Sequence, residues 1–68
     1  MKLKRERAFM AYIIDNDKIV ATCLRGSAYK WYVVIMNDED PIEVLPGFYD
    51  CVEDAFNNFL VNYKKKPQ

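Results

Sequence analysis

Residues 9–36 read FMAYIIDNDKIVATCLRGSAYKWYVVIM and contain three apolar runs separated by two turn signals. The runs are rich in β-branched and aromatic residues, which favour extended strands. The two turn signals between the runs contain Asn16-Asp17 and Gly26-Ser27. A Gly-Ser pair at the centre of a two-residue loop is typical of a type II′ hairpin. The stretch therefore predicts an antiparallel meander of three strands.

Two-residue turns would fix the register of this meander, with Ile14 opposite Ile19 and Leu24 opposite Tyr29. Side chains alternate between the two faces of a strand. The alternation predicts one largely apolar face made of Phe9, Ala11, Ile13, Val20, Thr22, Leu24, Tyr29, Trp31, Val33 and Ile35. It predicts a second face, also largely apolar, made of Met10, Tyr12, Ile14, Ile19, Ala21, Cys23, Lys30, Tyr32, Val34 and Met36.

The rest of the chain predicts one helix. Residues 42–45 follow an acidic loop and form either a short fourth strand or an extended crossing segment. Asp50 is placed as an N-cap, with Glu53 completing a capping-box-like pair. Apolar residues then recur at helical spacing at Val52, Ala55, Phe56, Phe59, Leu60 and Tyr63. The prediction is a single α+β domain with a basic N-terminal arm (1–7), a meander of three or four antiparallel strands (8–48), a C-terminal helix on one face (50–65) and a tail (66–68).

A single helix with one apolar stripe covers only one face of such a sheet. The second face is then covered by residues 42–48, by another copy of the chain or by a different partner. The alternative is that the fourth strand and the N-terminal arm fold over it. An uncovered apolar face predicts a protein interface, with an adjoining acidic loop and these candidate residues: Met10, Tyr12, Ile14, Ile19, Tyr32, Val34, Met36, Asp38, Glu39 and Asp40.

The composition of the 68 residues excludes several classes of function. Ten basic and ten acidic residues give a formal net charge of zero, which provides no overall attraction to nucleic acid or anionic membranes. The absence of His rules out Ser-His and Cys-His nucleophile pairs within one chain. Two distant cysteines and no His argue against structural zinc. We therefore expect a cytoplasmic, non-enzymatic protein without metal, cofactor or membrane span; a reactive Cys51 thiol at the helix start is the enzymatic alternative.

Residues 30–63 resemble a known type of DNA-binding domain. A strand with an early tryptophan (Trp31), an acidic loop, and a helix introduced by Gly47-Phe48 and containing Glu53, Asp54 and Ala55 are similar to the arm-site domain of phage-type tyrosine integrases and the plant ethylene-response-factor domain. The resemblance implies a sheet-plus-helix fold that reads DNA with its exposed sheet face. It makes nucleic-acid candidates of Lys2, Lys4, Arg5, Arg7, Arg25 and Lys30. The second sheet face is more apolar than the DNA-reading face of those families, and the acidic loop stands where a DNA-binding protein would carry basic residues.

The function predicted from the sequence is a non-enzymatic protein-binding module that docks its apolar aromatic face and acidic loop on a partner or on a second copy, as a homodimer. By analogy, its size suits a phage or mobile-element accessory or inhibitor protein. The alternative is a small DNA-binding module of the integrase-arm type that uses the sheet and the basic tails.

Overall fold

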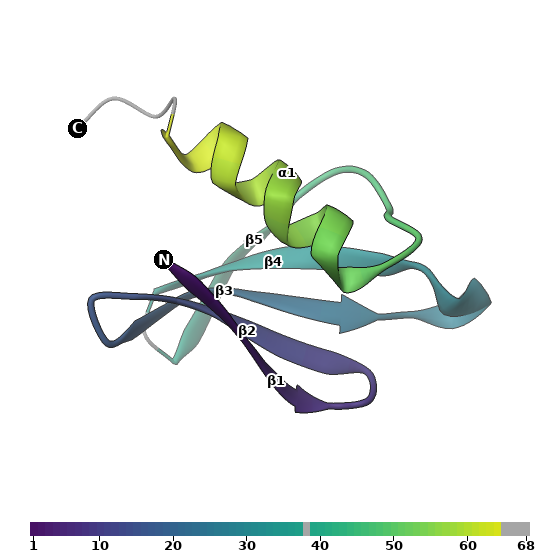
Figure 1. The fold of residues 1–68 in the computed structure, drawn as a ribbon, viewed down its shortest axis with the longest axis horizontal. Helices are drawn as coiled ribbons and strands as arrows, with labels where there is room; N and C mark the ends of the chain where they lie inside the picture. Colours follow the sequence, from purple (N-terminus) through teal and green to yellow (C-terminus); the bar gives the residue numbers. More distant parts are fainter. Residues whose placement is uncertain (38, 65–68) are drawn as a thin grey trace.

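The chain folds as an α+β domain in which strands follow one another across a single antiparallel sheet and one helix covers it (Figure 1). The computed structural model describes residues 1–37 and 39–64. The sheet has five strands in the order β1-β2-β3-β4-β5, where the sequence predicted three or four. The elements are β1 (Lys2–Arg7), β2 (Met10–Asp15), β3 (Lys18–Arg25), a 3-10 turn (Ser27–Tyr29), β4 (Trp31–Asn37), β5 (Asp40–Val44) and α1 (Val52–Lys64).

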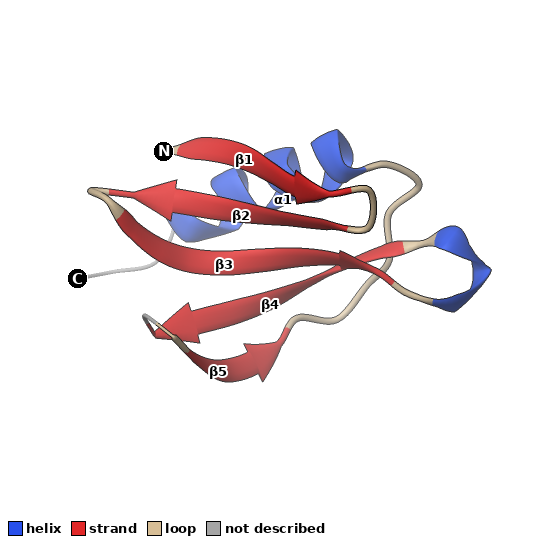
Figure 2. Ribbon diagram, turned by 90° about the horizontal axis from the view of Figure 1, so that it is seen from below, coloured by secondary structure: helices blue, strands red, loops and turns tan. Residues whose placement is uncertain are grey.

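Both additional strands lie at the edges of the sheet. The segment predicted as a basic arm is β1, which pairs with β2 and places Lys4 opposite Tyr12. Residues 42–45 were predicted as a strand or a crossing segment; β5 pairs with β4 through Val44 opposite Val34. Neither segment folds over a face, because its backbone groups are used for pairing at an edge. The sheet is widened and stays one layer thick (Figure 2).

The β2–β3 hairpin confirms the predicted two-residue turn but contains a bulge that the sequence analysis missed. Asn16 and Asp17 both have positive φ, as a type I′ turn requires, and Ile14 pairs with Ile19 as predicted. The next pair is Ile13 with Ala21, so Val20 is an extra residue. This one-residue shift moves the rest of β3 to the opposite face. Ala21 and Cys23 therefore face the helix, and Thr22 and Leu24 face away from it, the reverse of the prediction.

The β3–β4 connection is also longer than predicted. Leu24 pairs with Tyr32 and not with Tyr29, and the loop comprises residues 26–30. The Gly26 N–H donates a hydrogen bond to the carbonyl oxygen of Lys30 at 2.8 Å, which closes the loop without a two-residue turn. The longer loop puts Trp31 opposite Arg25, on the helix side of the sheet, where it is buried. The Gly26-Ser27 pair therefore does not form the predicted two-residue turn.

The helix packs on one face, as predicted, and forms the core there. Buried side chains of α1 meet the inward-facing residues of the sheet in a cluster of Ala11, Ile13, Ala21, Cys23, Trp31, Val33, Val52, Ala55 and Phe59. The helix begins at Val52, which places Cys51 and not Asp50 at the cap position; the Asp50 carboxylate accepts a hydrogen bond from Lys30. The side chain of Tyr63 and the predicted tail (66–68) lie outside the described residues.

Candidate functional site

The sheet face opposite α1 is the candidate site, and we call it the open face. Its side chains come from β2, β3, β4 and β5, and in β3 the bulge at Val20 separates Ile19 from Thr22. In Figure 2 the sheet lies in front of the helix, and no described element crosses this face. It comprises Met10, Tyr12, Ile14, Ile19, Thr22, Leu24, Tyr32, Val34, Met36, Pro41 and Val44.

Register places the members of the open face in continuous rows. Tyr12 is opposite Thr22, Thr22 is opposite Val34, and Val34 is opposite Val44, so one row runs from β2 to β5. Thr22 and Val34, in the middle of this row, are 6% and 8% exposed, although no described element covers the face. Their neighbours in the sheet shield them, and the accessible surface comes mainly from the flanking side chains. The result is a closely packed, mostly apolar surface whose hydroxyl groups are those of Thr22, Tyr12 and Tyr32.

The open face has a cationic border on one side. Lys2 is opposite Ile14 and Lys4 is opposite Tyr12, so both lysines stand on the open face at the β1 edge, and Arg7 is opposite Met10. These three cations have no ion pair within residues 1–37 and 39–64. The opposite border, β5, carries Pro41 and the exposed Val44, without a cation. The face is therefore apolar in the middle and asymmetric in charge across its width.

The structure places seven of the predicted interface residues together on this face: Met10, Tyr12, Ile14, Ile19, Tyr32, Val34 and Met36. Sequence reasoning missed Thr22 and Leu24, because no local signal revealed the bulge at Val20. It also missed Val44, because a single register could not be assigned to residues 42–45. Ala21 and Cys23, which were predicted on the second sheet face but not as interface residues, are in the core instead.

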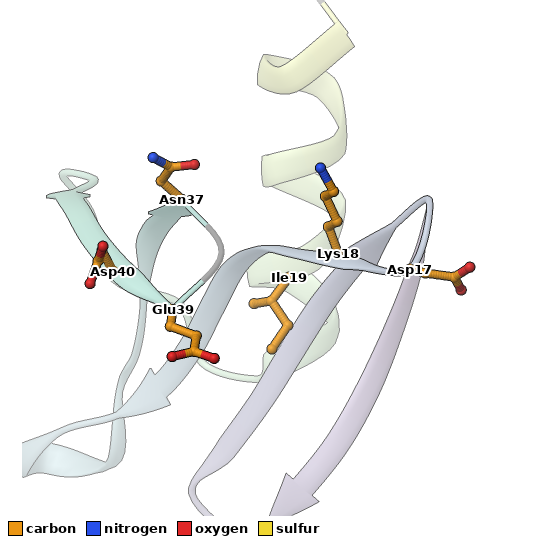
Figure 3. Close-up of a pocket in the computed structure, with 6 residues that line it drawn as sticks. All are labelled: Asp17, Lys18, Ile19, Asn37, Glu39 and Asp40. Atoms are coloured by element: carbon orange, nitrogen blue, oxygen red, sulfur yellow. The ribbon is translucent and has the colours of Figure 1, made fainter.

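The described residues of the acidic loop lie at one end of the sheet, beside the rows of the open face and outside them. Asp38 lies outside the described residues, and Glu39 and Asp40 are at the β4–β5 turn. With the β2–β3 turn they line an open hollow of about 550 Å³ at one end of the sheet (Figure 3). In that view Asp17 points away from the hollow, and Glu39 points to the opposite side from Asn37 and Lys18. Among the described residues that line the hollow, the charged side chains do not converge on a common point.

Half of the nucleic-acid candidates are engaged within the chain. Arg5 lies 5.8 Å from the centroid of the Trp31 ring, and its Nη1 is 3.8 Å from Glu53 Oε2. Arg25 lies 5.5 Å from the centroid of the Tyr29 ring, and Lys30 pairs with Asp50. The last pair holds the pKa of the Asp50 carboxyl below its ordinary value, first through the hydrogen bond and then through the charge of Lys30. Only the β1 border, described above, retains unpaired candidates.

The two thiols occupy different environments. Cys23 is buried in the core, and burial raises the pKa of its thiol to about 11 because the thiolate would lose its hydration. Cys51 is free and half-buried at the residue before α1. Within the described part of the chain, no three His, Cys, Asp or Glu side chains gather as a metal site. No described helix has the length and apolar character needed to cross a bilayer.

Comparison with known proteins adds no relative. No protein-family model, curated protein or solved structure matches this chain.

Proposed function

We propose that the protein is a non-enzymatic protein-binding module and that the open face is its binding surface. One observation carries the proposal: the helix covers one side of the sheet, and the other side is apolar and has no cover among the described residues. Soluble monomers rarely leave contiguous apolar patches larger than a few hundred Å² exposed. A protein surface of complementary shape would remove this face from water.

The residue types of the open face suit a protein partner. Tyr12 and Tyr32 are half-buried aromatic side chains, the type enriched at the centres of interfaces. The two methionines, Met10 and Met36, are flexible and adapt to irregular surfaces. These groups stand on paired strands, which hold them in place before binding and lower the entropy lost on association.

Binding to DNA is the second candidate, and the position of β1 favours it. Lys2 and Lys4 lie on the same face as Tyr12, which places two cations beside an aromatic side chain. A nucleic-acid face combines such groups. Three points weigh against it: Arg5, Arg25 and Lys30 are engaged elsewhere, the centre of the face is aliphatic, and the net charge is zero.

Affinity capture with matched variants tests the proposal. The tagged chain is used as bait in extracts of cells that naturally produce it, alongside Tyr12→Asp on the open face and Val61→Asp on the exposed side of α1. Val61 is 53% exposed, so its substitution adds the same charge away from the sheet. We expect a protein that binds the wild type and Val61→Asp but not Tyr12→Asp.

Two results would contradict this expectation. If both variants retain the same proteins as the wild type, the open face is not the binding surface. If the bound material is nucleic acid, and neutralising Lys2 and Lys4 releases it with a steep salt dependence, the DNA-binding alternative holds instead.

A further inference from the structure

We infer that the occupant of the open face is a second copy of this chain, stacked sheet on sheet around a two-fold axis that runs along β3. This inference rests on the proposed function, since it assigns the partner of the same surface. It also specifies the arrangement: β1 of each subunit lies over β5 of the partner subunit.

The size of the open face reaches the minimum expected of a specific dimer interface. Five strands about 4.8 Å apart and about 20 Å long form a rectangle of roughly 500 Å². This is about a tenth of the 4949 Å² accessible surface of the chain. Two such faces bury about 1,000 Å² together, which is about the minimum for a specific interface. A zero net charge means that two copies do not repel each other overall.

The edges of the sheet oppose the other route to self-association, which is strand pairing. Two β1 edges would bring together the cations of both copies, and like charges side by side are unfavourable. The β5 edge carries Pro41, which has no N–H to donate, together with the charged Asp40 and Glu43. Pairing β1 with β5 of another copy would be head-to-tail and would propagate into a filament. The open face has no comparable protection.

Charge selects one orientation of the two stacked faces. A two-fold axis across the strands would place the lysine border of one subunit over the same border of its partner. An axis along β3 exchanges the borders, so Lys2 and Lys4 lie over the partner's β5. It also keeps the strand ends together, because Lys2, Ile14 and Ile19 are at the same end of the sheet as the β4–β5 turn.

An acidic group stands at that corner. In Figure 3 the Glu39 side chain points to the same side of the sheet as Ile19, a member of the open face. With the axis along β3, Lys2 approaches Glu39 of the partner subunit, and the symmetry repeats this contact. The arrangement therefore has an apolar centre and, at its rim, two ion pairs that each join Lys2 to Glu39 of the partner subunit. Specific interfaces have such an apolar centre and a charged rim.

The first measurement is the solution mass by light scattering over a dilution series. The wild type is expected to change from 8.0 kDa to twice that mass as its concentration rises. Leu24→Asp puts a carboxylate on the central strand of the buried face, between Met10 and Tyr32, and is expected to weaken the dimer at least about a hundredfold. Val61→Asp is the matched control and is expected to leave the dimer unchanged. Circular dichroism establishes that each variant is folded.

A charge swap tests the orientation of the two stacked sheets. It uses substitutions at exposed positions, which should leave the fold intact. Lys2→Glu alone and Glu39→Lys alone are each expected to weaken self-association about fivefold to tenfold. Mixing the two variants restores both rim pairs, so the mixture should dimerise within about threefold of the wild type. If the mixture dimerises no more strongly than either variant alone, the β1-over-β5 arrangement is wrong.

The outcomes separate this inference from the proposed function. A wild type that is monomeric at every concentration overturns the homodimer, whereas the protein-binding function stands if Tyr12-dependent capture of another protein is observed. A dimer that survives Leu24→Asp unchanged places self-association on another surface and overturns the inference. A monomer that binds duplex DNA through Lys2 and Lys4 overturns both.

Discussion

Replacement of Phe59 by alanine tests whether the helix contributes the core of this fold on one side of the sheet. Phe59 is 2% exposed and belongs to the cluster between α1 and the sheet. Truncating a buried phenylalanine costs about 3–5 kcal/mol, because apolar contacts are lost and a cavity remains. A domain of 68 residues has a free energy of unfolding of roughly 3–10 kcal/mol. The variant should therefore lose a large part of its stability.

The assay is urea unfolding followed by the fluorescence of Trp31, the single tryptophan of the chain, which is buried beside the helix. Wild type and variants are compared at one protein concentration, because the stability of a dimer depends on concentration. A loss of about 3 kcal/mol corresponds to a fall in Tm of at least about 12 °C for a domain of this size. The urea concentration at the midpoint of unfolding should fall, while the fluorescence of the folded state should stay as in the wild type.

Val61→Ala is the matched control on the outward side of the same helix. Val61 is 53% exposed, so its truncation should change the free energy of unfolding by less than about 0.5 kcal/mol. A loss below about 1 kcal/mol for Phe59→Ala, or equal losses for the two variants, would refute the packing of α1 on this face. The sheet face assigned to α1 would then also be left without a cover, and nothing would single out the open face.

Three further predictions concern single groups. The Asp50 carboxyl should titrate below its ordinary pKa in carboxyl NMR spectra and return to it in Lys30→Ala; because the folded pKa is lowered, the pair stabilises the fold above the unfolded-state pKa and loses this effect as pH falls through the folded value. An unshifted Asp50 would show that the pair does not form. In the native protein at pH 8, a maleimide should modify Cys51 and spare Cys23 until denaturant is added, since Cys23 is buried with a pKa of about 11; equal rates for both thiols would contradict the core placement. Gly47→Ala should lower the free energy of unfolding by about 1–2 kcal/mol in the same urea assay, since Gly47 has φ +104°, and an unchanged midpoint would argue against that backbone conformation.

Local signals in the sequence predicted much of the fold. The apolar periodicity from Val52 located the helix, because the 3.6-residue repeat depends only on neighbouring residues. The Asn16-Asp17 turn was also predicted correctly, because two consecutive residues that accept positive φ suit a tight hairpin. The prediction that one helix leaves one face of the sheet uncovered followed from these elements alone.

Long-range pairing decided the features that the sequence left unassigned. The bulge at Val20 moves Ala21 and Cys23 into the core and brings Leu24 to the open face. The N-terminal cations looked like a free arm, because alternating charged residues lack an apolar signal for a strand, yet β2 provides a partner for their backbone. Likewise Asp50 had the sequence context of a helix cap, but the fold places Lys30 beside it.

Local sequence patterns were enough to predict the class of the fold, the position of the helix and a second apolar face. The side chains of β3 that occupy that face, and the charges that border it, depend on the register between strands. They could not be predicted, because a one-residue shift in register exchanges the two faces of a strand. Here the shift buries Ala21 and Cys23 against residues that are distant in the chain, among them Trp31 and Phe59.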